Sequence, residues 1–186
     1  IGAVRGAAAQ DVRLLSTKVA DILAQFPGDS AAKRDKLAAE VLALGEPGVA
    51  EFAKRLVPAG TGNDTAVRFA LNAVSVYASQ AGEPQRALAE RALCAALGAA
   101  SDTEVRTFLL SQLQPPGRDA AVKAAAPLLS DPAMVEPVTQ LLLSVNSPAA
   151  RAALMRAVGE AAGPAKLTMV KALGEMKAAE ANDRIL

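Results

Sequence analysis

The sequence predicts an all-α protein whose helices form a repeating array, and three observations support this class. Of its 186 residues, 52% are hydrophobic but only 3% are aromatic, so the core has to be built largely from Ala, Leu and Val. Ala and Leu are among the strongest helix formers, and no sustained alternation of β-branched and polar residues indicates strands. Helix-start signals also return at steps of roughly 30 to 40 residues, the spacing of paired-helix repeats.

One pattern occurs twice and marks the start of a helix each time. It runs Asp64-Thr65-x-Val67-Arg68-x-x-Leu71 and then Asp102-Thr103-x-Val105-Arg106-x-x-Leu109. An Asp before an apolar stretch is a typical N-cap, because its carboxylate can accept hydrogen bonds from the first turn and faces the positive end of the helix dipole. We therefore expect Asp64 and Asp102 to cap two equivalent helices.

Equivalent starts can be placed along the rest of the chain, and a second series of helices lies between them. The predicted starts are Asp29-Ser30, Asp64-Thr65, Asp102-Thr103, Asp131-Pro132 and Gly163-Pro164. The partner helices are predicted to open near Glu46-Pro47, Glu83-Pro84, Gly117, Ser147-Pro148 and Lys177. Two alternating series predict about five antiparallel helix pairs, each too small to bury its apolar face alone.

The chain divides into two predicted parts. Residues 1–28 form a loose lead-in and a capping helix, which Pro27-Gly28 ends, and residues 29–186 form the helical array. Pro127 and Pro137 lie inside apolar patterns of the array. Each is expected to kink its helix or to shorten it by a turn, because proline removes a backbone donor and clashes with the preceding turn.

The helix that follows Asp64 is predicted to be packed on most of its sides. The residues expected on its buried face are Val67, Ala70, Leu71, Val74, Tyr77 and Ala78. Phe69 and Val76 are expected to make its flanks apolar as well. The residues left to face water are Arg68, Asn72, Ser75 and Ser79. A helix with one narrow polar stripe is typical of the inside of a stack of helices.

Charge and residue counts exclude several classes of function. Twenty basic and nineteen acidic residues leave a formal charge of +1, which gives no field for steering nucleic acid or an anionic membrane. The absence of His removes the usual acid/base at neutral pH and the commonest ligand for zinc or iron. Cys94 lies in an apolar stretch and is expected to be a small buried thiol. We therefore predict no catalytic residue, no cofactor and no metal site.

The sequence also bears on location. No charge-free apolar run is long enough to cross a bilayer, so we expect a soluble protein without a membrane segment. The chain begins with Ile1 instead of Met, which indicates a processed or excised fragment. Both a cytoplasmic location and export after removal of a signal peptide are compatible with this beginning and with a single Cys.

The repeated motifs resemble HEAT repeats of the short bacterial type, over about residues 29–186. The resemblance is carried by Asp64-x-x-Val67-Arg68, Asp102-x-x-Val105-Arg106, Ala43-Leu44-Gly45 and Ala172-Leu173-Gly174. It implies a right-handed α-solenoid in which Asp and Arg at the start of each second helix link neighbouring repeats. It also implies that the second helices line a concave binding surface. The Asp131 unit departs from the motif with Met134 and Val135, and the Gly163 unit lacks both the Asp and the Val-Arg pair.

The second helices would then present one polar stripe each to a bound partner. The stripes comprise Lys33, Lys36 and Glu40, then Arg68, Asn72, Ser75 and Ser79, then Thr103, Thr107, Ser111 and Gln114, then Glu136, Gln140 and Ser144, then Thr168, Lys171 and Glu175. Our candidate partner-binding residues are Arg68, Asn72, Arg106, Gln140 and Lys171. The alternative is an ordinary solvated face, which every soluble helix has. For Arg68 and Arg106 a structural link to the preceding Asp is the stronger expectation.

The leading functional hypothesis is a non-enzymatic scaffold that binds a protein or peptide along its concave face. One alternative is a HEAT-like enzyme, either a DNA glycosylase or a lyase. Balanced charge and the absence of Trp argue against a glycosylase, and the absence of His argues against a His-ligated di-iron enzyme. A further alternative is a structural spacer of a longer protein. We predict a protein or peptide partner and no nucleic-acid partner.

Overall fold

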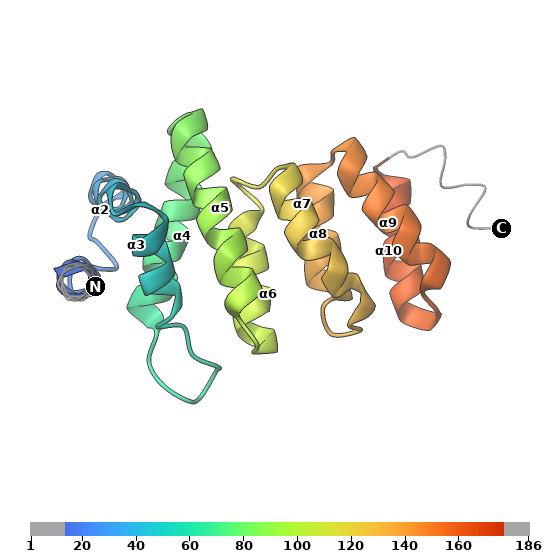
Figure 1. Ribbon diagram of the computed structural model, residues 1–186, viewed down its shortest axis with the longest axis horizontal. Helices are drawn as coiled ribbons and strands as arrows, with labels where there is room; N and C mark the ends of the chain where they lie inside the picture. Colours follow the sequence, from blue (N-terminus) through green and yellow to red (C-terminus); the bar gives the residue numbers. More distant parts are fainter. Residues whose placement is uncertain (1–13, 177–186) are drawn as a thin grey trace, which may run out of the picture. The chain divides into compact units, whose positions relative to one another are not determined.

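The computed structural model describes residues 14–176, and all regular secondary structure in this range is helical (Figure 1). The elements with defined bounds are α2 (Ala31–Ala43), α3 (Gly45–Ala53), α4 (Thr65–Gln80), α5 (Glu83–Ala99), α6 (Thr103–Leu113), α7 (Asp119–Ala125), the 3-10 helix η1 (Ala126–Ser130), α8 (Val135–Val145), α9 (Pro148–Glu160) and α10 (Gly163–Glu175). Residues 14–23 are helical as well. The predicted all-α class is confirmed. The helix predicted near Lys177 lies outside the described residues.

The chain forms two compact units, Ile1–Ala92 and Leu93–Leu186, and the division between them falls within α5. In the first unit, α2 packs against α3 and α4, and α3 packs against α4. The fully buried large side chains of this unit include Leu37, Phe52 and Leu71, one from each of these helices. Helices that are adjacent in sequence therefore share one core.

In the second unit the helices pack in two layers. Helices α6, α8 and α10 pack one against the next, and α7 with η1 packs against α9. Helix α8 also contacts α7, η1 and α9, which joins the layers, and Figure 1 shows α7 to α10 side by side. The fully buried large side chains of this unit are Leu93, Leu109, Leu110, Leu113, Met134, Leu141, Leu142, Leu154 and Met169. The predicted packing between neighbouring helices is present here, and leucine dominates its core.

The N-caps follow the sequence signals in part. Asp102 caps α6 as predicted, because its Oδ1 accepts from the N–H groups of Glu104 and Val105 at 3.0 Å each. For α2 the cap is Ser30 and not Asp29, since Ser30 Oγ accepts from the N–H three residues on at 3.2 Å. A short hydroxyl reaches the first-turn donors as well as a carboxylate does.

Prolines shift the boundaries of two helices. The start predicted at Asp131-Pro132 is too early, because the Asp131 carboxylate closes a turn by accepting from the Ala133 N–H at 3.0 Å, and α8 begins only at Val135. Pro137 lies in the first turn of α8, where no backbone donor is needed. Pro127 lies just after α7, and the chain continues there as the 3-10 helix η1. The predicted shortening at both prolines is confirmed.

The second predicted cap, Asp64, does not bind the first turn of α4. Its carboxylate accepts from the Val57 N–H at 3.0 Å and from Arg68 Nε at 2.9 Å, and Arg68 Nη2 donates to the Val57 carbonyl oxygen at 3.1 Å. Asn63 takes over as acceptor, since its Oδ1 binds the Thr65 N–H at 3.1 Å. The Asp64–Arg68 pair thereby closes the loop that precedes α4. The predicted structural link between these two residues is confirmed.

This pair gives the protein an acid-sensitive contact. Burial alone would raise the pKa of the Asp64 carboxyl. Hydrogen bonds from Arg68 and from the Val57 N–H, together with the Arg68 charge, lower the pKa by more than burial raises it, so the pKa lies below its ordinary value. A carboxyl with a lowered pKa stabilises the fold above its unfolded pKa of about 3.9, and this contribution is lost as pH falls through the folded pKa.

We expect Asp64→Asn to lose about 1 kcal/mol of unfolding free energy near neutral pH, because an amide cannot pair with the guanidinium. The difference between wild type and variant should persist down to about pH 5 and shrink as pH falls below about 4. Urea unfolding at several pH values measures it. Asp29→Asn, at an exposed position, is the matched control. A difference that stays constant into strong acid would contradict the assigned pair.

Burial does not always follow residue type, and the predictions of burial for four residues are wrong. Ser75, predicted to face water, is fully buried, while Phe69 and Val76, predicted to be packed, are 46% and 41% exposed. Phe69, Asn72 and Val76 lie three to four residues apart and share the exposed side of α4. Cys94 is half-buried and not fully buried. The water-facing stripe of α4 is therefore centred on Asn72 and is partly apolar.

Candidate functional site

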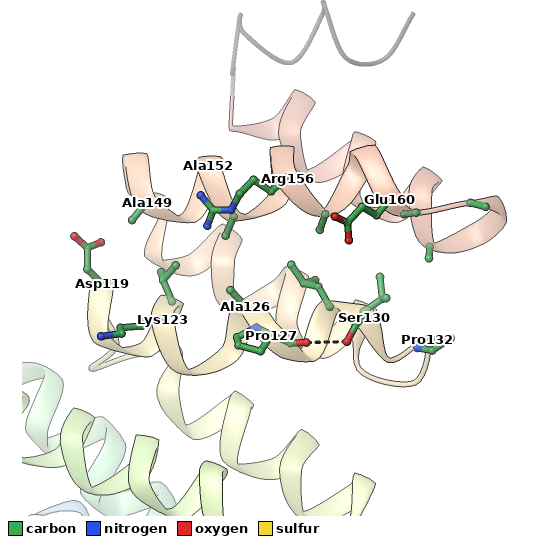
Figure 2. Close-up of a pocket in the computed structure, with 18 residues that line it drawn as sticks. Asp119, Lys123, Ala126, Pro127, Ser130, Pro132, Ala149, Ala152, Arg156 and Glu160 are labelled. Carbon is green, nitrogen blue, oxygen red and sulfur yellow. Dashed lines mark hydrogen bonds between the residues drawn. The ribbon is translucent and has the colours of Figure 1, made fainter.

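A groove of about 890 Å³ lies in the second unit between α7 with η1 on one side and α9 on the other (Figure 2). We call it the α7–α9 groove. The residues that line it are Asp119, Val122, Lys123, Ala126, Pro127, Leu129, Ser130, Pro132, Val135, Ala149, Ala152, Ala153, Arg156, Ala157, Glu160, Ala161, Ala162 and Ala165. Eight of these eighteen residues are alanines, so most of its surface is aliphatic.

Small side chains and one proline create the groove. On the α9 wall, Ala149, Ala152, Ala153 and Ala157 occupy positions where a larger side chain would reach toward α7. Across from them, Pro127 follows the end of α7. Side chains fill the space between packed helices. Because alanine side chains are short and α7 ends before Pro127, this space is not filled and a hollow remains.

Charged side chains stand at the edge of this hollow. Asp119 and Lys123 come from α7, Arg156 and Glu160 come from α9, and all four are exposed. Figure 2 shows Arg156 projecting from α9 on the same side as Asp119, with Glu160 farther along the helix. The Asp119 Oδ1 accepts a hydrogen bond from Ser147 Oγ at 2.7 Å. The groove therefore combines an aliphatic floor with a rim that carries both signs of charge.

This arrangement is suited to binding, because an aliphatic surface lies next to exposed charged groups. A catalytic site brings polar groups together in a desolvated pocket, whereas the charged groups here lie in water. Within residues 14–176, no group of three or more His, Cys, Asp or Glu side chains is placed to hold a metal ion. Aliphatic walls that open to solvent, with ions along the edge, resemble the surfaces on which proteins dock segments of other proteins.

Of the predicted partner-binding residues, the two arginines already donate hydrogen bonds within the fold. Arg68 binds Asp64 and the Val57 carbonyl, as described above. Arg106 Nε donates to the Ala100 carbonyl oxygen at 2.8 Å. The link expected between Arg106 and Asp102 is replaced by this bond, because Asp102 turns its carboxylate to the N–H groups of α6. Both arginines thus hold the chain segment that precedes their helix.

The other three predicted residues are exposed, and each lies on a different helix. Asn72 lies on α4 in the first unit, and Gln140 and Lys171 lie on α8 and α10 in the second. Gln140 Nε2 donates to Glu136 Oε1 at 2.9 Å along its own helix. None of the five predicted residues lines the α7–α9 groove. Their role in binding stays a prediction.

The polar stripes of the second unit are hydrogen-bonded within the fold. Thr107 Oγ1 donates to the Thr103 carbonyl oxygen at 2.9 Å, and Ser111 Oγ donates to that of Phe108 at 2.6 Å. Ser144 Oγ donates to the Gln114 carbonyl oxygen at 3.1 Å. Side chains that already donate to backbone carbonyls have fewer free donors for a partner.

The groove was not predicted from the sequence, because the binding surface was expected on the other helix of each pair. A signal for it is present in the runs AAVKAAAP, from Ala120, and PAARAAL, from Pro148, which place alanines on two successive partner helices. By itself, alanine indicates only a strong helix former and a small core residue. Where two alanine-rich faces oppose each other beside a proline, they also predict a gap.

No family model matches the chain, and no curated protein or solved structure does either. The resemblance to HEAT repeats therefore rests on the quoted motifs alone. Among the described helices, none has both the length and the apolar character that a membrane span requires.

Proposed function

We propose that this chain is a non-enzymatic helical scaffold that binds a segment of another protein in the α7–α9 groove. The observation that supports it is the open aliphatic hollow of about 890 Å³ with charged side chains at its edge. Burying aliphatic surface contributes about 25 cal/mol per Å² to the free energy of binding, and the charges at the rim fix the orientation of the bound segment. A short protein segment can supply both kinds of contact.

The architecture that we propose for the scaffold is a HEAT-like right-handed solenoid. Two features favour it. In the second unit, every other helix packs against its counterpart, α6 with α8 with α10 and α7 with α9. The Asp-x-x-Val-Arg pattern opens α4 and α6, and at both places its Arg holds the preceding backbone. In such an array each helix pair depends on its neighbours for a core, and grooves arise between successive pairs.

A protein segment suits this groove better than a small metabolite. Sites for small molecules bury most of the ligand and place a few polar groups inside an enclosed cavity. Here the ionic groups stand at the edge and are exposed, and the interior offers alanine, valine and leucine side chains. A peptide main chain can keep its polar groups toward water while its aliphatic side chains enter the groove.

The test is direct selection of ligands on the whole chain. A displayed library of random peptides would be panned against the immobilised protein, and the recovered peptides would be measured in solution by fluorescence anisotropy. Ala152→Phe, which places a ring in the groove from a half-buried position, is expected to abolish binding. Ala99→Phe, at an exposed position outside the groove, is the matched control and should bind like wild type.

Three outcomes decide the proposal. Binding that Ala152→Phe removes and Ala99→Phe leaves intact supports it. Binding that survives Ala152→Phe places the site elsewhere and contradicts the assignment of the groove. Failure to recover any peptide that binds in solution contradicts the scaffold function itself.

A further inference from the structure

The α7–α9 groove carries two cations that the fold itself does not neutralise. Lys123 on α7 and Arg156 on α9 both line it, and both are exposed. No carboxylate of the described residues lies within the 4.0 Å of an ion pair with either. Elsewhere in the structure, Arg68, Arg86 and Arg91 each have an acidic partner within 3.0 Å. Lys123 and Arg156 therefore remain available to an acidic group that enters the groove.

The two acids that line the groove do not form ion pairs with Lys123 or Arg156. Asp119 begins α7, and its carboxylate is used by Ser147, which caps the start of α9. Glu160 is the last residue of α9, and Figure 2 shows it displaced along the helix from Arg156. Asp119 thus lies near one end of the groove and Glu160 near the other end (Figure 2). An additional negative charge is best accommodated between them, beside Lys123 and Arg156.

The surface beside the cations is aliphatic. Ala126 and Pro127 follow Lys123 along the chain, while Ala152, Ala153 and Ala157 surround Arg156 on α9. An aliphatic side chain that enters here contributes favourable binding free energy because it leaves water. A positively charged side chain would be repelled by Lys123 and Arg156. The chemistry that fits is a carboxylate with aliphatic side chains next to it.

We propose that the segment bound in the α7–α9 groove carries an acidic side chain that pairs with Lys123 and Arg156, flanked by small or aliphatic residues. This inference rests on the proposed function, since it specifies which protein segment the groove selects. Arg can bind a carboxylate through two parallel N–H groups, and Lys adds a mobile positive charge from the opposite wall. The pair thereby fixes where along the groove the acidic residue lies.

The experiment uses peptides from the random displayed library, which contains carboxylates but no phosphate. We expect Asp or Glu to be enriched at one position of the recovered sequences, next to aliphatic residues. The best peptide would then be synthesised as recovered and with that carboxylate changed to the amide. The amide form should bind about tenfold more weakly, since two partly exposed ion pairs together are worth roughly that factor. The difference should shrink as salt is added.

Matched charge reversals locate the contact. The double variant Lys123→Glu/Arg156→Glu should lose the acidic peptide and should gain affinity for the same peptide with Lys in place of the carboxylate. Lys18→Glu/Arg34→Glu, at two exposed positions of the first unit, makes the same change of charge outside the groove and should bind like wild type. Circular dichroism and thermal unfolding would confirm that both variants fold.

The outcomes separate this inference from the function on which it rests. If recovered peptides bind in the groove but show no acidic position, or if the amide form binds equally well, the charge assignment is wrong and peptide binding stands. If the control variant loses binding to the same extent as the groove variant, the contact is not local to the groove and the charge assignment is wrong. If no peptide binds at all, the scaffold function fails and this inference fails with it.

Discussion

Replacing Arg86 with Met is expected to destabilise the first unit by about 3 kcal/mol, because it leaves a buried carboxylate without its cation. Arg86 lies in the first turn of α5, and its side chain is 12% exposed. Its Nη1 donates to Glu90 Oε2 at 3.0 Å, and its Nε donates to Glu83 Oε2 at 2.8 Å. The Glu90 side chain is only 6% exposed, whereas that of Glu83 is 73% exposed. The two acids therefore depend on Arg86 to different degrees.

Variants of the two acids test this assignment. Glu83→Gln should cost well under 1 kcal/mol, because exposed ion pairs contribute little. The double variant Arg86→Met/Glu90→Leu should recover most of the stability lost in Arg86→Met, since an apolar pair can replace a buried ion pair of similar size. Urea unfolding of the four proteins measures these differences. Equal effects of Arg86→Met and Glu83→Gln would contradict the importance of the buried partner.

Replacing Gly117 with Ala is expected to cost about 2 kcal/mol, because the added methyl group would overlap backbone. A Cβ at Gly117 would lie 2.3 Å from the Leu113 carbonyl oxygen and 3.0 Å from the Ala121 Cβ. The Gly117 N–H also donates to that carbonyl at 2.8 Å and closes the turn from α6 into α7. A backbone atom cannot rotate away as a flexible side chain can, so the turn has to open.

Gly159 provides the opposite case in the same unit. It lies within α9, and no heavy atom lies within 4 Å of the position of an added Cβ. Gly159→Ala should raise stability by roughly 0.5 to 1 kcal/mol, since alanine loses less conformational freedom than glycine in a helix. The midpoints of urea unfolding of both variants give the comparison. Destabilisation by both changes would show that the effect at Gly117 is not the steric one described.

The helical part of the fold was accessible from sequence because it depends on local signals. Asp102 shows this well: a capping side chain before an apolar stretch sets the start of α6. Asp64 has the same neighbours in sequence but points elsewhere, because the loop before α4 brings the Val57 N–H within 3.0 Å of its carboxylate. A helix cap depends on residues of its own turn and can be predicted from the local sequence. A contact with a loop several residues away cannot be predicted in this way.

The candidate site was less accessible, for a similar reason. The sequence indicates which residues are polar, and those on α6 and α8 are exposed as predicted at Thr107, Gln140 and Ser144. It does not indicate that Ser75 fits into the core or that Phe69 stays in water, since both depend on which helices pack against α4. A groove is a space that side chains fail to fill, so it depends on the distance between two helices and the size of the residues on both.

The α7–α9 groove is the proposed binding site for a partner, and both proposals above depend on it. Backbone amide chemical shifts of the ¹⁵N-labelled protein, followed during titration with the best selected peptide, test it most directly. We predict that the largest changes fall on α7, η1 and α9, around Lys123 and Arg156. Large changes on the exposed faces of α4, α6 and α8, with α7, η1 and α9 unaffected, would contradict it.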